Sequence, residues 1–115
     1  MSDSKTVLPY VNKEVSFTYC KKKCTFLLSQ GPFSSFDIDA GTKLLLKIAA
    51  QQLSIPPESR VLDFGCGTGV LGLALKAANP DISLESYDRD ALTLLFTSLN
   101  ADRNKLSLSA VQGRI

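Results

Sequence analysis

The chain has 115 residues, of which 44% are hydrophobic and 21% charged, and its formal net charge is +2. This length favours one domain with a buried core, and the charge is too small to indicate a nucleic-acid partner by itself. Three cysteines and no histidine argue against a disulfide framework, a Cys/His zinc site and a histidine general base, so we expect three reduced thiols. The polar N-terminus and the lack of a membrane-spanning apolar run favour a cytoplasmic protein.

The first quarter of the sequence predicts a loose tail followed by a β-hairpin. Residues 1–9 are polar, lack periodicity and end in Pro9, which is typical of a loose tail. Apolar and polar residues alternate from Val15 to Tyr19, and β character resumes after Lys21–Lys23. The pattern therefore predicts a hairpin over residues 15–28. We expect the lysines to form a solvated turn, with a phosphate-binding tip as the alternative.

An irregular segment rich in glycine, proline and serine separates the hairpin from the first predicted helix. Asp37 or Asp39 is suited to cap this helix, because a carboxylate can accept from the free N–H groups of a first turn. Pro56 and Pro57 end it. Apolar residues at helical spacing form one stripe, made of Leu44, Leu45, Ile48, Ala49 and Leu53.

Strands and helices alternate over the remainder of the chain. The predicted elements are a strand over 60–64, a helix over 69–78, a strand over 82–87, a helix over 91–99 and a strand over 106–111. This alternation predicts an α/β fold with a parallel sheet and right-handed crossovers, that is, a Rossmann-like core over residues 39–111.

Three alternating glycines, Gly65, Gly67 and Gly69, follow the first of these strands. Glycine lets the backbone curl tightly and approach a ligand closely. The helix start that follows offers unpaired N–H groups and the positive end of the helix dipole, which suit a carboxylate or phosphate. We therefore expect the ligand site at this loop.

The same loop also fits the dinucleotide fingerprint GxGxxG if it is counted from Gly67 to Gly72. That fingerprint begins where the strand ends, which is near Phe64, so its first glycine should be Gly65. Counting from Gly65 puts Val70 at the third glycine position, where close packing of helix on strand is required. A nicotinamide or flavin dinucleotide is thus the alternative reading of the loop.

Two acids flank the loop, since Asp63 precedes the glycines and Asp88 ends the next strand. Asp88 can accept hydrogen bonds from ribose hydroxyls, and Asp63 offers negative charge to an ammonium or sulfonium group. A ligand with a cation, a ribose and no pyrophosphate fits this pattern, so it favours S-adenosylmethionine. The alternative is that both acids only cap helices.

The sequence resembles a known family in several of these segments. Residues 61–69 are similar to motif I of class I S-adenosylmethionine-dependent methyltransferases, and Tyr87-Asp88 to the end of their second strand. Residues 31–46 and 100–104 resemble the small methyltransferase domain, as in small-subunit ribosomal RNA guanine-N2 methyltransferases. The resemblance runs from about Val15 to Val111.

This resemblance implies one partial methyltransferase domain over residues 1–115, with sheet order 3-2-1 preceded by the hairpin and a helix. It implies S-adenosylmethionine as cofactor and RNA as methyl acceptor. The cofactor-binding residues that it implies are Asp39, Gly41, Thr42, Asp63, Gly65, Cys66, Gly67, Gly69, Asp88 and Arg89.

The sequence departs from the family pattern in two places. Residues 112–115, with Arg114, stand where relatives usually have an acid near the adenine, and the chain ends before the Asn-Pro-Pro-aromatic motif that orients the target amine. We therefore expect a truncated, cofactor-binding half that has no catalytic residue and is inactive alone. The strand over 60–64 would have an open edge, which predicts self-association through it or coverage by the hairpin. A non-catalytic interaction module is the remaining alternative.

Overall fold

The computed structural model describes residues 4–30, 35–36 and 40–113. Its elements are η1 (Ser4–Tyr10, a 3-10 helix), β1 (Lys13–Tyr19), β2 (Lys22–Gln30), β3 (Ser35–Phe36), α1 (Ala40–Gln52), β4 (Arg60–Phe64), α2 (Val70–Ala78), β5 (Ser83–Asp88), α3 (Ala91–Arg103) and β6 (Ser109–Gln112). The α/β class with a parallel sheet is confirmed, since β4, β5 and β6 pair in parallel, in the order β4-β5-β6.

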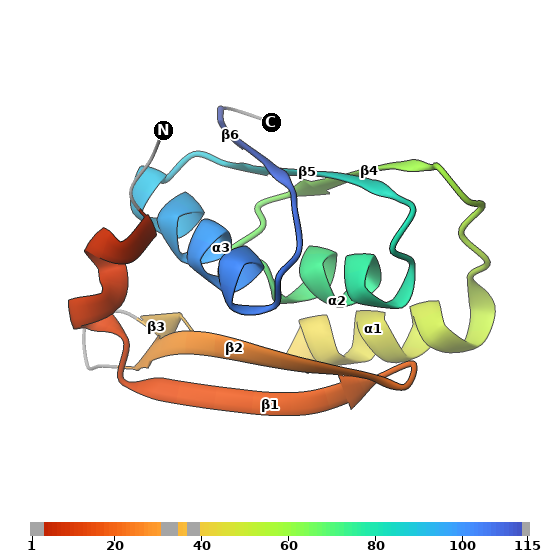
Figure 1. The fold of residues 1–115 in the computed structure, drawn as a ribbon, viewed down its shortest axis with the longest axis horizontal. Helices are drawn as coiled ribbons and strands as arrows, with labels where there is room; N and C mark the ends of the chain where they lie inside the picture. The colour runs from red at the N-terminus through yellow and green to blue at the C-terminus, as the bar shows by residue number, and fades with distance from the viewer. Residues whose placement is uncertain (1–3, 31–34, 37–39, 114–115) are drawn as a thin grey trace.

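The elements form layers (Figure 1). The parallel sheet makes one outer layer, helices α2 and α3 lie beneath it, and the hairpin of β1 and β2 makes the opposite outer layer. The core fills the space between hairpin and sheet, with Phe26, Leu73 and Leu84 among its buried side chains. Both outer layers thus depend on the same two helices for their apolar contacts.

The hairpin turns at two residues, Cys20 and Lys21, whose φ angles are 48° and 68°. Two left-handed residues give the turn a twist that matches antiparallel strands. The strands extend beyond the predicted range of 15–28, and Lys22 and Lys23 belong to β2 rather than to the turn. Among the described residues, β2 also pairs with β3 through Ser29 and Gln30.

The prediction of a loose tail over residues 1–9 is wrong for the part that the structure describes. Residues 4–10 form the 3-10 helix η1, in which Val7 is 0% exposed. Val7 packs in a small apolar cluster with Phe96 and Leu99 of α3. A single buried valine in a polar segment gives no periodic signal, so the sequence pattern could not reveal this contact.

The predicted apolar stripe of α1 is mostly exposed to solvent. Leu46 and Ala49 are the buried residues of this helix, whereas Leu44, Leu45 and Ile48 are exposed. The helix packs on α2, and the hydroxyl of Tyr19 donates to the carbonyl of Leu46 at 2.9 Å. Helical periodicity identifies an apolar stripe, but it does not say which element covers it.

Strand β4 lies at the edge of the parallel sheet, and no strand among the described residues pairs with its outer side. On the sheet face away from α2, Leu62 and Phe64 are 42% and 48% exposed. The predicted coverage of this edge by the hairpin is wrong, because the hairpin forms a separate sheet on the far side of the helices (Figure 1). Across the described part of the chain, no helix has the length and apolar character needed to cross a membrane.

Candidate functional site

The glycine loop, residues 65–69, connects β4 to α2 and is tied to the neighbouring strand. The φ angles of Gly65, Gly67 and Gly69 are 69°, 58° and 88°, all in the left-handed region. The N–H groups of Gly65 and Cys66 both donate to the carbonyl of Tyr87, at 2.8 and 3.1 Å. The loop therefore folds back over the carboxyl end of β5, where an acid was predicted.

The glycines serve two different purposes. A Cβ built on Gly65 or Gly67 would meet no atom within 4 Å, so both residues face open space and are needed for their backbone conformation. A Cβ on Gly69 would lie 3.0 Å from the Thr97 side chain of α3, so this glycine is also needed for close packing. The open side of the loop is where a ligand can approach the backbone.

Asp88 lies at the end of β5, beside the loop. Its Oδ2 accepts from the N–H of Gly67 at 3.4 Å, and its Oδ1 accepts from the N–H of Asp90 at 3.0 Å. The first contact is long for a hydrogen bond, so Oδ2 is only weakly held and can accept from another donor. Asp90 caps α3 by accepting from Leu92, which leaves Asp88 free of that structural task.

Asp63 lies at the end of β4, and its carboxylate reaches the first turn of α2. A Cβ on Gly72 would lie 2.9 Å from Asp63 Oδ2, which shows how closely the two residues pack. Oδ2 is buried and has no hydrogen-bond partner among the residues that the structure describes. Burial raises the pKa of Asp63, the backbone N–H of Gly72 lowers it, and the charge of Asp88 raises it again.

Cys66 lies in the glycine loop, and the charges of both acids affect its pKa. The thiol is buried, and burial raises the pKa of Cys66 to about 11; the charges of Asp63 and Asp88 both add to this rise. Cys66 is therefore a neutral thiol near pH 7 and not a nucleophile. The two carboxylates lie around one loop, because Asp63 is in the strand that enters it and Asp88 accepts from the N–H of Gly67.

The other predicted site residues lie outside the glycine loop. Gly41 and Thr42 lie in the first turn of α1, which packs on α2. Arg89 follows Asp88 at the surface, and its carbonyl accepts from Gln112 at 3.1 Å. Asp39 lies outside the described residues, and so do Arg114 and the predicted helix cap Asp37.

Sequence reasoning missed the residues that hold the loop from behind. Thr97 donates its hydroxyl to the Gly67 carbonyl at 2.7 Å, and Asn100 donates to the Thr68 carbonyl at 2.9 Å. Both side chains are fully buried on the core side of α3. The available signal was a row of polar residues at helical spacing, made of Thr93, Thr97 and Asn100 in this helix and Asn104 at its C-terminal end.

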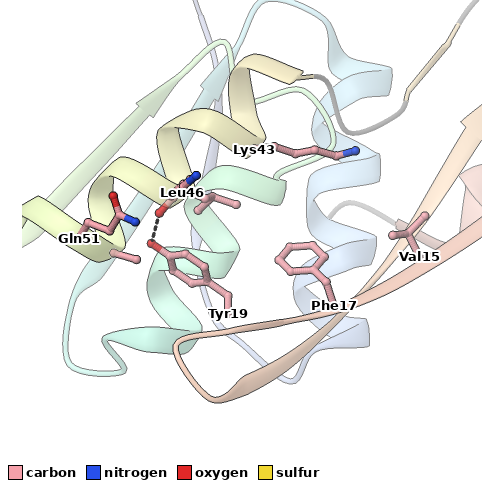
Figure 2. Close-up of a pocket in the computed structure, with 8 residues that line it drawn as sticks. Val15, Phe17, Tyr19, Lys43, Leu46 and Gln51 are labelled. Atoms are coloured by element: carbon pink, nitrogen blue, oxygen red, sulfur yellow. Dashed lines mark hydrogen bonds between the residues drawn. The ribbon is translucent and has the colours of Figure 1, made fainter.

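A separate cavity of about 480 Å³ lies between β1 and α1 (Figure 2). Its walls are mainly apolar, with Phe17, Tyr19 and Leu46 facing the opening and Lys43 and Lys47 among the lining residues. No residue of the glycine loop lines it. The chemistry of the predicted ligand, which needs polar and acidic partners, therefore matches the loop and not this cavity.

Across the part of the chain that the structure describes, no group of three or more His, Cys, Asp or Glu side chains could hold a metal ion.

Curated relatives of the chain include ribosomal RNA small subunit methyltransferases C from several bacteria. This chain is 44% identical over 75 residues to ribosomal RNA small subunit methyltransferase C of Shewanella amazonensis, and the match covers 64% of this chain and 20% of the relative. It is 35% identical over 96 residues to the enzyme of that name from Vibrio parahaemolyticus, which covers 83% of this chain and 26% of the relative. The chain thus spans about a fifth to a quarter of the length of these relatives.

A solved structure of high similarity is the T. thermophilus 16S rRNA guanine N2 methyltransferase RsmC in complex with AdoMet and guanosine. It matches with a TM-score of 0.73 and 26% sequence identity, over 94% of this chain and 29% of that chain. The family model described as "Methyltransferase small domain" matches residues 23–115, which is most of the sequence. The chain therefore belongs to the methyltransferase small domain family.

Proposed function

We propose that the glycine loop, with Asp63 and Asp88, binds S-adenosylmethionine, and that the chain is the cofactor-binding half of a methyltransferase domain acting on the guanine N2 position of ribosomal RNA. One observation carries the proposal: two carboxylates at the ends of neighbouring parallel strands surround a loop of three left-handed glycines. The relatives named above are ribosomal RNA methyltransferases, and one of them was solved with AdoMet and guanosine. A cytoplasmic location belongs to the same proposal.

The residues present fit this cofactor. The open space in front of Gly65 and Gly67 admits a ligand against the backbone, which a side chain would obstruct. Asp63 carries a buried oxygen without a hydrogen-bond partner among the described residues, and a nearby ligand cation would favour its charged form. When bound, the cofactor supplies an electrophilic methyl group on a sulfonium.

In this proposal the residues of the chain bind and orient the cofactor. Asp88 would accept hydrogen bonds from the ribose hydroxyls, mainly through Oδ2, which is only weakly bonded to the N–H of Gly67, since Oδ1 accepts from Asp90. Cys66, whose side chain is buried within the loop, stays a neutral thiol, since burial raises its pKa to about 11. Methyl transfer depends mainly on in-line positioning of the acceptor. We therefore expect cofactor binding from these 115 residues, and transfer to RNA only together with acceptor-orienting residues outside them.

Isothermal titration with S-adenosylhomocysteine tests cofactor binding directly. The wild-type chain should bind, and Asp88→Ala should weaken binding about 100-fold, because hydrogen bonds to a charged group contribute roughly 1.5–3 kcal/mol each. Asp81→Ala is the matched control, since Asp81 is an exposed acid in the turn before β5. Binding of a nicotinamide nucleotide without binding of S-adenosylhomocysteine would overturn the proposal.

The close packing of Gly72 favours the alternative that the loop binds a dinucleotide. A Cβ on Gly72 would lie 2.9 Å from Asp63 Oδ2 and 3.0 Å from Leu84, so Gly72 packs as closely as the third glycine of a dinucleotide fingerprint. Against it, β4 ends at Phe64, directly before Gly65. A non-catalytic interaction module would show no thermal stabilisation by either ligand, and Asp88→Ala would not change its melting temperature in their presence.

The proposal also includes self-association of the isolated chain. The outer side of β4 has no pairing strand among the described residues, and Leu62 and Phe64 are exposed on one face of it. An unprotected apolar edge favours pairing with another chain. A second copy supplies such an edge in identical form, so pairing of β4 with β4 is the arrangement that we propose.

A further inference from the structure

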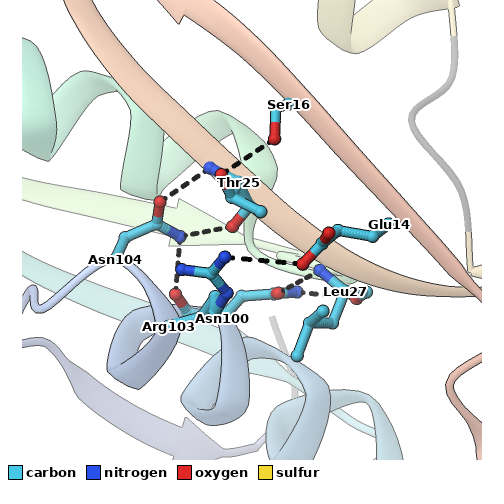
Figure 3. Close-up of polar contacts among 7 residues, drawn as sticks. All are labelled: Glu14, Ser16, Thr25, Leu27, Asn100, Arg103 and Asn104. Carbon is cyan, nitrogen blue, oxygen red and sulfur yellow. Dashed lines mark hydrogen bonds and ion pairs between the residues drawn. The ribbon is translucent and has the colours of Figure 1, made fainter.

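The outer edge of β2 is closed by two asparagine side chains, from Asn100 in α3 and from Asn104 at the C-terminal end of that helix (Figure 3). Asn104 accepts from the N–H of Thr25 and donates to its carbonyl, both at 2.8 Å. Asn100 accepts from the N–H of Leu27 at 2.6 Å and donates to its carbonyl at 3.1 Å. Each carboxamide therefore forms the pair of hydrogen bonds that a residue of a neighbouring strand would form.

The two asparagines differ in what their third hydrogen bond reaches. Asn104 donates to the carbonyl of Asn100 at 2.7 Å, which stays within its own helix. Asn100 donates to the carbonyl of Thr68 in the glycine loop at 2.9 Å. Asn100 is 0% exposed and uses its carbonyl oxygen and both amide hydrogens. One side chain thus joins the hairpin to the loop.

We propose that Asn100 is a positioning residue for the cofactor loop, and that it makes the hairpin an energetic part of the cofactor site. The ligand part of this inference rests on the proposed function, whereas the coupling of hairpin to loop does not. The geometry also predicts the converse: a ligand that orders the loop stabilises the hairpin through Asn100, because coupling between two sites is reciprocal.

The hydrogen bonds to the loop fix the orientation of its peptide groups. Thr97 holds the Gly67 carbonyl and Asn100 holds the Thr68 carbonyl, so two consecutive carbonyls of the loop point towards α3. In a trans peptide the N–H points opposite to the carbonyl. The N–H of Thr68 therefore points away from α3. Loss of Asn100 would release one of these peptide groups and leave the buried Thr68 carbonyl and Leu27 N–H unsatisfied.

The experiment compares Asn100→Ala with the matched variant Asn104→Ala. Both remove a carboxamide that bonds the N–H and carbonyl of one β2 residue, but only Asn100→Ala removes a bond to the loop. Amide hydrogen exchange without ligand is measured at residues 65–69 and at Thr25 and Leu27. Asn100→Ala should speed exchange in the loop about tenfold, the equivalent of one neutral hydrogen bond, and Asn104→Ala should not. Equal loop exchange in the two variants would overturn the coupling. If Asn100→Ala cannot be purified, Asn100→Ser takes its place.

Titration with S-adenosylhomocysteine adds a measurement that a merely structural role would not change. The ligand should bind Asn100→Ala about tenfold more weakly than Asn104→Ala. In the wild-type chain, the ligand should slow exchange of the Leu27 amide more than that of the Thr25 amide, and equal slowing would overturn the inference. A wild-type chain that does not bind this ligand would refute the proposed function, while the exchange comparison without ligand would still decide the coupling.

Discussion

Two strand edges of this molecule meet the same physical problem with different results. The outer edge of β2 and the outer edge of β4 each present backbone groups that need hydrogen-bond partners. Asn100, Asn104 and β3 pair with the β2 edge, whereas no strand in the described part of the chain pairs with β4. The asparagines lie one turn apart on α3, so they match alternate residues of β2.

The difference shows what a helix can and cannot do for a strand. Side chains at i and i+4 can close a short length of edge, and here they bond Thr25 and Leu27. The five residues of β4 pair with β5 on one side only, and their outer backbone groups can be paired along the whole strand only by another strand. The closed edge therefore makes the hairpin part of the fold, while the open edge is where another strand is expected.

The largest effect should come from opening the β2 edge. The double variant Asn100→Ala/Asn104→Ala leaves four backbone groups of Thr25 and Leu27 without their present partners, and an unsatisfied buried group costs roughly 1–3 kcal/mol. We expect a loss of about 4 kcal/mol in the free energy of unfolding, measured by urea denaturation. Asn79→Ala is the control, because that carboxamide bonds Leu75 at the end of its own helix. A double variant as stable as this control would contradict the account.

The second effect concerns the open edge of β4. Leu62→Lys should weaken self-association at least about tenfold, since a lysine on an edge strand disfavours pairing with another edge. Leu53→Lys, which replaces an even more exposed leucine outside β4, should leave self-association unchanged. Sedimentation velocity over a range of concentrations measures both variants. A wild-type chain that stays monomeric at high concentration would refute the role of this edge.

A third variant tests Asp63, the buried acid of β4 that packs against α2. Because burial raises the pKa of Asp63 above its ordinary value of 3.8, the folded chain holds this proton more tightly than the unfolded chain. The wild type therefore loses stability as the pH rises from about 3.8 through the raised pKa. Asp63→Asn should therefore be more stable than the wild type at pH 7, and this gain should vanish below about pH 3.8.

The same variant should bind S-adenosylhomocysteine more weakly, since the negative charge is lost. A gain in stability accompanied by a loss of affinity would identify Asp63 as a group retained for binding. Thermal unfolding over a pH series, with and without ligand, measures both quantities. If Asp63→Asn is less stable than the wild type at pH 7, the burial of an ionised carboxylate does not destabilise this fold.

The smallest effect is expected at the other attachment of the hairpin. Tyr19→Phe removes the hydroxyl that donates to the Leu46 carbonyl of α1 at 2.9 Å. This neutral bond lies in a half-buried position, so we expect a loss of about 0.5–1 kcal/mol in urea denaturation. Tyr10→Phe, at an exposed tyrosine, should have no measurable effect. A loss as large as that of the asparagine pair would show that α1, rather than α3, holds the hairpin.

Short-range patterns in the sequence were enough to predict the α/β class and most elements. Alternation identified the hairpin, and the three glycines with Asp63 and Asp88 identified a loop whose predicted acids do lie around it. These features depend on local backbone requirements that each residue carries in its own chemistry. The role of the loop as a cofactor site stays a prediction.

Long-range partners could not be predicted in the same way. Of the predicted apolar stripe of α1, Ala49 is buried, whereas Leu44, Leu45, Ile48 and Leu53 are exposed and Leu46, outside the stripe, is buried, because the choice depends on which element packs there. Val7 gave no pattern of its own, and the row of polar residues that includes Asn100 did not reveal its partners, since both residues contact segments far away in the sequence. Pairing across a fold is decided by surfaces that no short window contains.

The asparagine contacts to β2 can form only late in the synthesis of the chain. Thr25 and Asn104 are 79 residues apart, and Leu27 and Asn100 are 73 apart. At roughly 5–20 residues per second, the ribosome adds α3 about 4–15 s after the hairpin. During this interval the nascent hairpin has no helix to receive its free edge, so mispairing between neighbouring nascent chains competes with correct folding until α3 emerges.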